Sequence, residues 1–596
     1  MSKGGRVAVE AVVVLAVQGA LAVIATYPLI LRLGAGVPGI GDQLQNVWNL
    51  WWVSRETLAG RPFPFDTTYV YYPTGVSLAY HTLMPLNGWL ALLLERALGA
   101  NLATVYGLVT LGSFIATGFA TYLLVRAERL SQTAALAGSI VFTYAPIRMS
   151  RLVFGNLNLY STEMIPLAAL FAVKLTQSGR RRYAVLAAIM VGMTAWLDLF
   201  LALGSALTVL LIVALGLPWR QTARASARTM IEVTLLTAVL TLAFSLPVVW
   251  PMARDAVLFR DQSDQRQASI DNSADLLGFV VPDNMTAPLV KRAVPGAAAF
   301  IEGVYGSFQG NDAEKNVFVG YTVLALVVVA AFLGRRPAVW RWLAIAAIFF
   351  VLSLGPLLHV GGQVIMSRLP YGLLASTPLI GFGRSPDRFA LFLMLALAVV
   401  VGLGLTGLEA RHWAFRWLSV AVGALVFIEF LVAPIPIDGR VAAIPTYYAA
   451  LPPVASGAAG ILDVPIDLYG AAGPGDRHML YQTVHGRPIV GGYISRTPTA
   501  ALWPFDRPFL RALRVRIYGD TEPYHFDNAT LAHAIPDLCA LGVGRVVLHS
   551  DELPPDEART VRQALTQALA APTYEDSRLS AWDFDASQQC ARAPSS

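Results

Sequence analysis

The chain has 596 residues, of which 56% are hydrophobic and only 14% are charged. Soluble domains carry about 25% charged residues, so this composition excludes an ordinary soluble protein and is typical of a polytopic membrane protein. The net charge is +6. We attribute it to basic loops that anchor helices, because no basic tract with interleaved aromatic residues is present, and we expect no nucleic-acid partner.

Apolar segments long enough to approach the width of a bilayer recur along the first 435 residues. A spanning helix needs about 20 apolar residues. We predict about eleven spans: 7–31, 102–125, 132–149, 158–175, 183–197, 199–217, 229–251, 316–334, 338–355, 386–408 and 413–434. The first segment is too long for the apolar region of a signal peptide, so it is interpreted as a retained helix.

Basic residues predict the orientation of these helices. With the N-terminus inside, the basic clusters fall on the cytoplasmic side, as the positive-inside rule requires. They include Lys3 and Arg6, Arg126 and Arg129, Arg180 to Arg182, and Arg411 and Arg416. An odd number of spans then places the C-terminus outside the cytoplasmic membrane, together with two long loops, 33–101 and 252–315.

The stretch 183–217 is almost continuously apolar. A single helix of this length would measure about 50 Å, which exceeds the thickness of a bilayer. We therefore predict a hairpin with Asp198 at its outer tip.

The first outer loop is predicted to carry two helices that lie on the membrane surface. In 43–56, tryptophans and aliphatic residues recur at helical spacing opposite amide side chains, which is typical of an interfacial amphipathic helix. The segment 83–98 is apolar but too short to span, and Pro85 marks its start.

Asp42 stands at the start of the first of these helices, in the stretch GIGDQLQNVWNLWW. Aspartate is a preferred N-cap, and Gln45 completes a pattern like a capping box. The same acid, held at the membrane surface, can serve as a catalytic base. The two interpretations are compatible, and the sequence leaves both open.

After a transmembrane domain over 1–435, the segment 436–596 is less apolar and is predicted to form one extracytoplasmic α/β domain. Its expected elements are strands at 460–465, 544–550 and 576–584 and a helix at 554–570. Cys539 and Cys590 both lie here. If this part is outside, the two cysteines can form one disulfide, and otherwise they are two unrelated thiols.

Four quoted stretches, in this order, resemble parts of the GT-C class of polytopic glycosyltransferases, including bacterial members. They are GDQLQNVWNLWW, YYPTGVSLAYHTLMPLNGWL, APIRMSRLVFGNLNLYSTEMIPLAAL and GRSPDRFALF. The resemblance covers most of 1–435 and rests on the order of the motifs more than on any one of them. MLYQTVHGRPIVGGYISR is similar to an outer domain often joined to such proteins.

This resemblance implies that a sugar is transferred from a polyprenyl-phosphate-linked donor, outside the cytoplasmic membrane, to an envelope glycan, a glycolipid or a protein. It also implies that Asp42 is the base and that transfer inverts the anomeric carbon. The leaving lipid phosphate needs positive charge. Four basic residues near outer loops are candidates for binding this phosphate: Arg148, Arg151, Arg384 and Arg388. The alternative is that they snorkel to ordinary lipid headgroups.

Four other polar residues are candidates for the acceptor or the polar site, each with a structural alternative. Glu163 falls in the outer half of a predicted span. An ionised acid near the bilayer centre costs roughly 2.5–3.5 kcal/mol, so Glu163 is either a functional group that faces protein or a residue close enough to the surface to be solvated. Asp198 is also explained as a turn residue, and His81 as a polar interfacial residue. Glu314 precedes a span and can complement the dipole of the helix that follows.

The sequence departs from better-known members of this class. Asp42 follows Gly41 without an adjacent second acid, and no WWDYG-type signature is present. Both departures argue against protein N-glycosylation, and no paired-acid motif supports a divalent metal, so the metal requirement stays open. A transporter or flippase of a lipid-linked precursor, or a non-catalytic scaffold, remains the alternative.

Overall fold

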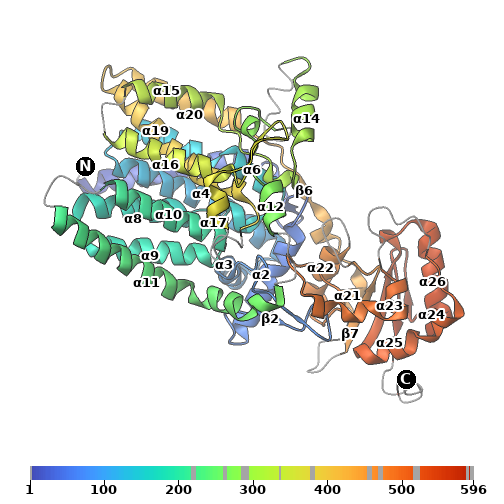
Figure 1. The fold of residues 1–596 in the computed structure, drawn as a ribbon. Helices are drawn as coiled ribbons and strands as arrows, with labels where there is room; N and C mark the ends of the chain where they lie inside the picture. Colours follow the sequence, from blue (N-terminus) through green and yellow to red (C-terminus); the bar gives the residue numbers. More distant parts are fainter. Residues whose placement is uncertain are drawn as a thin grey trace.

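The computed structural model shows a mainly helical protein (Figure 1). It describes residues 3–216, 223–259, 265–283, 294–333, 337–375, 383–452, 459–467, 474–514, 524–584 and 590. Parts of the second predicted outer loop, 260–264 and 284–293, therefore lie outside the described residues. Figure 1 shows a bundle of long helices on one side and a smaller C-terminal part on the other, with α2, α3 and α22 between them.

Each predicted span contains a helix. These helices are α1 (Lys3–Ala25), α4 (Leu102–Ala127), α5 (Gln132–Thr143), α8 (Met164–Ser178), α9 (Arg181–Ala195), α10 (Leu199–Gly216), α11 (Ala223–Asp255), α15 (Tyr321–Leu333), α16 (Pro337–Ser353), α19 (Phe389–Glu409) and α20 (Phe415–Phe430). The hairpin predicted within 183–217 is confirmed, because α9 and α10 are separate and Asp198 lies between them.

Five helices among the described residues are long and apolar enough to cross a membrane, which makes the chain a multi-pass membrane protein. They are Gly4–Ala25, Leu102–Ala127, Leu199–Gly216, Thr234–Leu258 and Pro386–Glu409. The other six helices are shorter than a full span, so the count of about eleven stays a prediction. α5 is short because Pro146 follows, and the residue before a proline avoids the helical conformation.

The core of the bundle is α19, whose residues are buried along nearly the whole helix. It packs against α5, α15 and α16, while α5 also contacts α4 and α20. By contrast, α11 exposes large aliphatic and aromatic side chains along its length, including Leu235, Val239 and Trp250. An apolar exposed face of this kind is suited to lipid.

The first loop forms α2 (Gln43–Leu58) and α3 (Pro85–Leu98). Every residue of α2 from Gln43 to Leu50 is buried, so its polar face does not point to water as the amphipathic pattern predicts, and its place at the membrane surface stays a prediction. Its amide groups bond to protein rather than to water: Asn46 donates to the carbonyl of Gly155 at 2.7 Å and Asn49 donates to the carbonyl of Thr82 at 2.8 Å. α3 has the predicted bounds and exposes Leu90 and Leu93, and its place at the membrane surface stays a prediction.

Short elements join these helices. In the loops and helix connections they are η1 (Leu29–Leu31), β1 (Val37–Pro38), β2 (Asp66–Thr67), β3 (Val76–Ser77), α6 (Pro146–Val153), α7 (Leu157–Tyr160), η2 (Ala256–Phe259), α12 (Gln265–Asp271), η3 (Leu276–Phe279), α14 (Ala297–Ser307), η4 (Asp312–Glu314), β4 (Leu358–Val360), β5 (Gln363–Met366), α17 (Pro370–Ala375) and η5 (Pro386–Arg388).

The C-terminal part contains a four-stranded sheet of order β7-β8-β10-β9. β7 and β8 are parallel and the other neighbours are antiparallel. Its elements are β6 (Ile437–Asp438), η6 (Gly439–Ala442), α21 (Thr446–Ala449), β7 (Gly460–Val464), α22 (Gly475–His485), η7 (Thr499–Asp506), α23 (Pro508–Ala512), α24 (Asn528–Ala532), α25 (Ala534–Leu541), β8 (Val543–His549), η8 (Ser550–Glu552), α26 (Pro555–Leu569), β9 (Tyr574–Glu575) and β10 (Leu579–Asp583). The predicted strands and the predicted helix lie where β7, β8, β10 and α26 are found.

One hydrophobic core joins the first loop to the C-terminal part. Trp48, Trp52 and Tyr71 of the loop pack in the same buried cluster as Ile461 and Val547 of the sheet. The expected boundary at 435/436 therefore runs through a continuous core, and the first loop is wedged between bundle and sheet.

Cys539 and Cys590 form a disulfide, with their Cα atoms 5.6 Å apart. The bond ties the end of α25 to residue 590 near the C-terminus. The paired alternative for these cysteines is therefore the one that the structure adopts.

Candidate functional site

A cavity of about 670 Å³ lies where the first loop, the bundle and the C-terminal part meet. Six of the predicted site residues line it: Asp42, His81, Asp198, Glu314, Arg384 and Arg388. The fold thus gathers side chains that are far apart in sequence around one space. Arg148, Arg151 and Glu163 are not among its lining residues.

Asp42 stands at the N-terminus of α2 but does not cap it, because its side chain bonds to no backbone N–H there. Its carboxylate is held from two other parts of the chain. Asn156 donates to Oδ2 at 2.7 Å, and the Tyr493 hydroxyl donates to Oδ1 at 2.9 Å. The capping-box pattern fails as well, since Gln45 donates instead to the carbonyl of Tyr493 at 3.2 Å. The side chain of Asp42 therefore does not serve as the cap of α2.

The electrostatics of Asp42 suit a base. Burial raises the pKa of its carboxyl above the usual value, the hydrogen bond from Tyr493 opposes that rise, and the charge of Glu314 adds to it. Burial and the charge of Asp42 also raise the pKa of Tyr493, so its hydroxyl keeps the proton that it donates. Each Asp42 oxygen accepts one bond and retains a lone pair for a hydroxyl in the cavity.

His81 faces the same cavity as a neutral imidazole, because burial lowers its pKa to about 3. Its Nδ1 accepts from the backbone N–H of Ser495 at 3.2 Å. The proton therefore sits on Nε2, which lies 2.8 Å from Oδ1 of Asn49. This histidine fixes the loop to the C-terminal part and is not poised to take a proton.

Glu314 and Asp198 are already engaged by neighbours. Arg388 donates to Oε1 of Glu314 at 2.6 Å, and Arg151 pairs with its other oxygen. Burial raises the pKa of Glu314, but the two guanidinium charges outweigh this effect and hold the pKa below its usual range. Asp198 accepts from Asn158 at 2.8 Å and from the N–H of Leu201 at 3.0 Å, so it caps α10, as the turn interpretation predicts.

Positive charge lines the cavity on the side of residues 383–388 and 493–496. Within the described part of the chain, the Arg384 guanidinium forms no hydrogen bond or ion pair. Arg496 lies close enough to Arg384 for the two charges to repel, and burial together with that repulsion lowers the pKa of Arg496 to about 10. Two like charges that share a cavity are suited to an anion with several oxygens, such as a phosphate.

Arg148 has a different environment. Its guanidinium is fully buried and donates to the carbonyls of Tyr160 at 2.9 Å and Thr143 at 2.6 Å. It also donates to the hydroxyls of Ser113 and Thr117. These bonds join α4, α5 and α7, so Arg148 holds helices together away from the cavity lining.

Arg151 and Glu163 also have protein partners. Arg151 is buried and pairs with Asp387 at 2.8 Å as well as with Glu314. Arg151 therefore positions Glu314 from the side that faces away from the cavity. Asp387 pairs with Arg151 rather than with Arg384 or Arg388, the partners that proximity in sequence suggests. Oε2 of Glu163 accepts from Ser113 at 2.9 Å, next to Arg148.

The sequence did not reveal Asn156, Asn158, Tyr493 and Arg496 as site residues. All four lie in stretches that resemble the GT-C class or its outer domain, so the motif order was the only available signal. Nothing in their local spacing indicates that two asparagines of the 146–160 turn and a tyrosine from the C-terminal part meet Asp42 and Asp198.

The acids of the cavity do not fit a shared metal ion. Among the described residues, Asp42, Asp198 and Glu314 do not come close enough to one another to hold one. Each is satisfied by amide, hydroxyl or guanidinium donors, as above.

Fold and site together define a multi-pass membrane protein with a buried acid and a basic wall in one cavity. The chain belongs to the family described as a domain of unknown function, DUF6311, whose model matches residues 15–429. The match includes the bundle and Asp42 and ends before the C-terminal sheet. No curated protein matches the chain.

Several solved structures resemble it at low identity. The Archaeoglobus fulgidus oligosaccharyltransferase in complex with Zn and sulfate is 13% identical, covers 90% of this chain and 68% of that chain, and gives a TM-score of 0.46. Its apo form is 14% identical, with 91% and 70% covered and a TM-score of 0.47. Archaeal oligosaccharyltransferase AglB from the same organism, in complex with an inhibitory peptide and a dolichol-phosphate, is 13% identical, with 91% and 69% covered and a TM-score of 0.45. Because these TM-scores are below 0.5, the resemblance carries no argument about activity, which rests on the residues of this chain.

Proposed function

We propose that this protein is an inverting membrane glycosyltransferase that uses a polyprenyl-phosphate-linked sugar. Its acceptor would be an envelope glycan, a glycolipid or a protein outside the cytoplasmic membrane. The observation that carries the proposal is Asp42, a carboxylate with a raised pKa that faces a cavity shared with Arg384 and Arg496.

The proposed reaction is a direct displacement at the anomeric carbon. Asp42 accepts the proton of the acceptor hydroxyl while the oxygen of that hydroxyl forms a bond to the anomeric carbon. The bond between the carbon and the phosphate oxygen breaks, and the electron pair leaves with the phosphate. Arg384 and Arg496 supply positive charge where this negative charge develops.

An apolar cavity of about 620 Å³ supports a lipid-linked donor. It runs between α10 and α11, and its lining includes Leu203, Leu207 and Leu242. Leu199 lines both this cavity and the polar one, so the two adjoin. A ligand with an apolar tail and a charged head fits such a pair of neighbouring surfaces.

The first test is mass spectrometry of lipids that co-purify with the full chain in detergent. We expect a polyprenyl-phosphate sugar enriched over a control membrane protein, and depleted in Arg384→Ala. Arg411→Ala is the matched control, because Arg411 is exposed at the other end of α19. Purified Asp42→Asn should keep the lipid and fail to transfer its sugar.

Two results would contradict this assignment. If wild-type protein carries only phospholipid and also leaves added polyprenyl-phosphate sugar intact in the presence of envelope acceptors, the donor class is wrong. If Arg384→Ala and Arg411→Ala retain equal amounts of donor, the phosphate does not bind at Arg384.

A further inference from the structure

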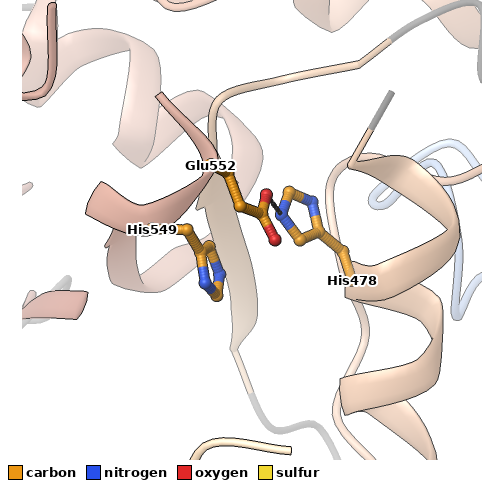
Figure 2. Close-up of side chains that lie close together, drawn as sticks. All are labelled: His478, His549 and Glu552. Carbon is orange, nitrogen blue, oxygen red and sulfur yellow. Dashed lines mark hydrogen bonds and ion pairs between the residues drawn. The ribbon is translucent and has the colours of Figure 1, made fainter. Parts of the chain in front are cut away.

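A second group of ionisable side chains lies in the C-terminal part, outside the cavity. It consists of His478 in α22, His549 at the end of β8 and Glu552 in η8. One nitrogen or oxygen atom from each lies within 4.8 Å of the others. Figure 2 shows the carboxylate of Glu552 between the two imidazole rings, which come from opposite sides.

All three side chains are almost fully buried, at 1–3% exposure. Nε2 of His478 lies 3.1 Å from Oε2 of Glu552, the only interaction drawn among the three in Figure 2. Imidazole and carboxylate groups are costly to bury unless each is paired. His478 pairs with Glu552 and His549 pairs with Asp463, which leaves the second nitrogen of each ring and the second oxygen of each acid to be accounted for.

Asp463 of β7 stands behind His549. Its Oδ1 lies 3.0 Å from Nε2 of His549 and accepts from the Tyr448 hydroxyl at 2.5 Å. A carboxylate that accepts a hydrogen bond from one imidazole N–H fixes the tautomer and leaves the other nitrogen without a proton. Metal-bound histidines commonly have such a carboxylate behind them.

Two acid oxygens in this group lack a hydrogen bond. Within the described residues, Oδ2 of Asp463 and Oε1 of Glu552 are buried without any hydrogen-bond partner. Oε1 of Glu552 has only an ion-pair contact, at 3.4 Å from Nη1 of Arg477. Buried carboxylate oxygens are rarely left this way, and a cation is one of the groups that satisfies them.

We propose that His478, His549 and Glu552 bind a divalent transition-metal ion, and that Asp463 positions His549 for it. Two imidazoles and one carboxylate match Zn²⁺ best by ligand type. Zinc bonds to nitrogen and oxygen are about 2.0–2.2 Å long, so binding draws the three side chains closer together.

The ion would join two elements that the sheet alone does not connect. His478 lies on α22, whereas His549 ends β8 and Glu552 lies in η8, which follows directly. α22 also carries Gln482, whose Oε1 accepts from Trp48 of α2 at 2.6 Å. The ion thus fixes the helix against which the first loop packs, and this role does not depend on the transfer reaction.

The test uses the full chain in detergent, loaded with Zn²⁺ and dialysed before metal analysis. We expect about one zinc per chain in the wild type, and loss of that zinc when His478 and His549 are both replaced by alanine. His533→Ala is the matched control, because His533 is an exposed histidine of the same part. It should retain the full amount.

Two milder variants keep the result clear if the double replacement does not fold. Glu552→Gln preserves shape and removes a ligand charge, so it should lose zinc while eluting as a single species. Asp463→Asn should weaken zinc binding by about 10–100-fold. With Co²⁺ in place of zinc, the wild type should show visible absorption bands that Glu552→Gln shifts or abolishes.

Wild-type protein that retains no more zinc than the double variant would overturn the proposal. Equal zinc in wild type and Glu552→Gln, with the same Co²⁺ spectrum, would place any bound metal elsewhere. Because the readouts are metal content and absorption, neither outcome depends on the donor or acceptor of the proposed transferase.

Discussion

At the scale of single residues, Asp42 combines two properties that a helix cap does not need. Its oxygens are held by Asn156 and Tyr493 from outside its own helix, and it faces open cavity space. Burial makes its carboxylate more basic than an exposed one, while the two donors stop it from turning away. A fixed and moderately basic carboxylate is what proton removal from a sugar hydroxyl requires.

Asp42→Asn should lower transfer by about 10²–10⁴-fold, the usual contribution of a positioned general base. The stability of the variant should barely change, because the Asp42 side chain does not cap α2 and asparagine has nearly the same shape. Turnover of a purified lipid-linked donor, with the melting temperature measured in parallel, checks both parts. Near-normal turnover in a folded variant would remove Asp42 from the mechanism.

Tyr493→Phe should shift the pH dependence of transfer. Transfer needs Asp42 without its proton, so activity rises as pH passes its pKa. The Tyr493 bond lowers that pKa, as do the charge of Arg388 and the bond from Asn156, whereas burial and Glu314 raise it. Loss of the bond therefore raises the pKa and moves the acidic limb of the profile to higher pH.

The measurement is a profile of kcat/KM against pH for wild type and Tyr493→Phe. Recovery of activity at higher pH in the variant would confirm the titration. A loss that is uniform across pH would instead mean that Tyr493 only positions the site.

At the scale of elements, α2 shows why an amphipathic pattern misleads here. In its first two turns the polar side chains are amides rather than charges, and each amide finds a protein partner, such as Asp438 for Gln43 at 2.7 Å. Amides can be buried when hydrogen-bonded, whereas charges seldom can. The helix and its bounds follow from local periodicity, but its burial depends on partners hundreds of residues away.

The same division applies to the rest of the fold and site. The bundle helices were predictable because apolar runs and their breaks are local properties, and so was the separate helix pair around Asp198. Asp42, Arg384 and Arg388 could be selected as polar residues at outer ends of helices. Arg148 has a structural role because it donates to four acceptors on other segments. The spacing of residues along the chain does not predict these contacts.

Arg148→Ala should destabilise the bundle by about 3 kcal/mol or more, since it leaves two carbonyls and two hydroxyls without their buried donor. Co-purified donor lipid should be unchanged at low temperature, because Arg148 does not line the cavity. The two readouts are the melting temperature in detergent and lipid mass spectrometry. Loss of co-purified donor without loss of stability would instead indicate that Arg148 binds the donor phosphate.

At the scale of the whole molecule, the C-terminal part contributes lining residues to the cavity and so completes it. Tyr493, Ser495 and Arg496 form one wall, and the shared core with Trp48 and Trp52 fixes that wall in place. The disulfide between Cys539 and Cys590 fits an oxidising compartment, which agrees with the proposed position outside the membrane.

Thiol labelling tests that position in cells whose outer envelope layers have been removed and whose cytoplasmic membrane is intact. A membrane-impermeant maleimide should label Cys539 and Cys590 only after mild reduction. In a variant that lacks both native cysteines, Arg411→Cys should react only once the membrane is opened, because Arg411 belongs to the expected inner side. Labelling in the reverse order would invert the proposed topology.

The bond between Tyr493 and Asp42 joins positions 451 residues apart. Because a chain is made from its N-terminus at about 5–20 residues per second, the acid is synthesised tens of seconds before the residue that holds it. During that interval the helices can enter the membrane while the cavity still lacks a wall. Translation that stops early therefore leaves an inserted bundle with an unfinished site, and the order of synthesis itself delays the onset of activity.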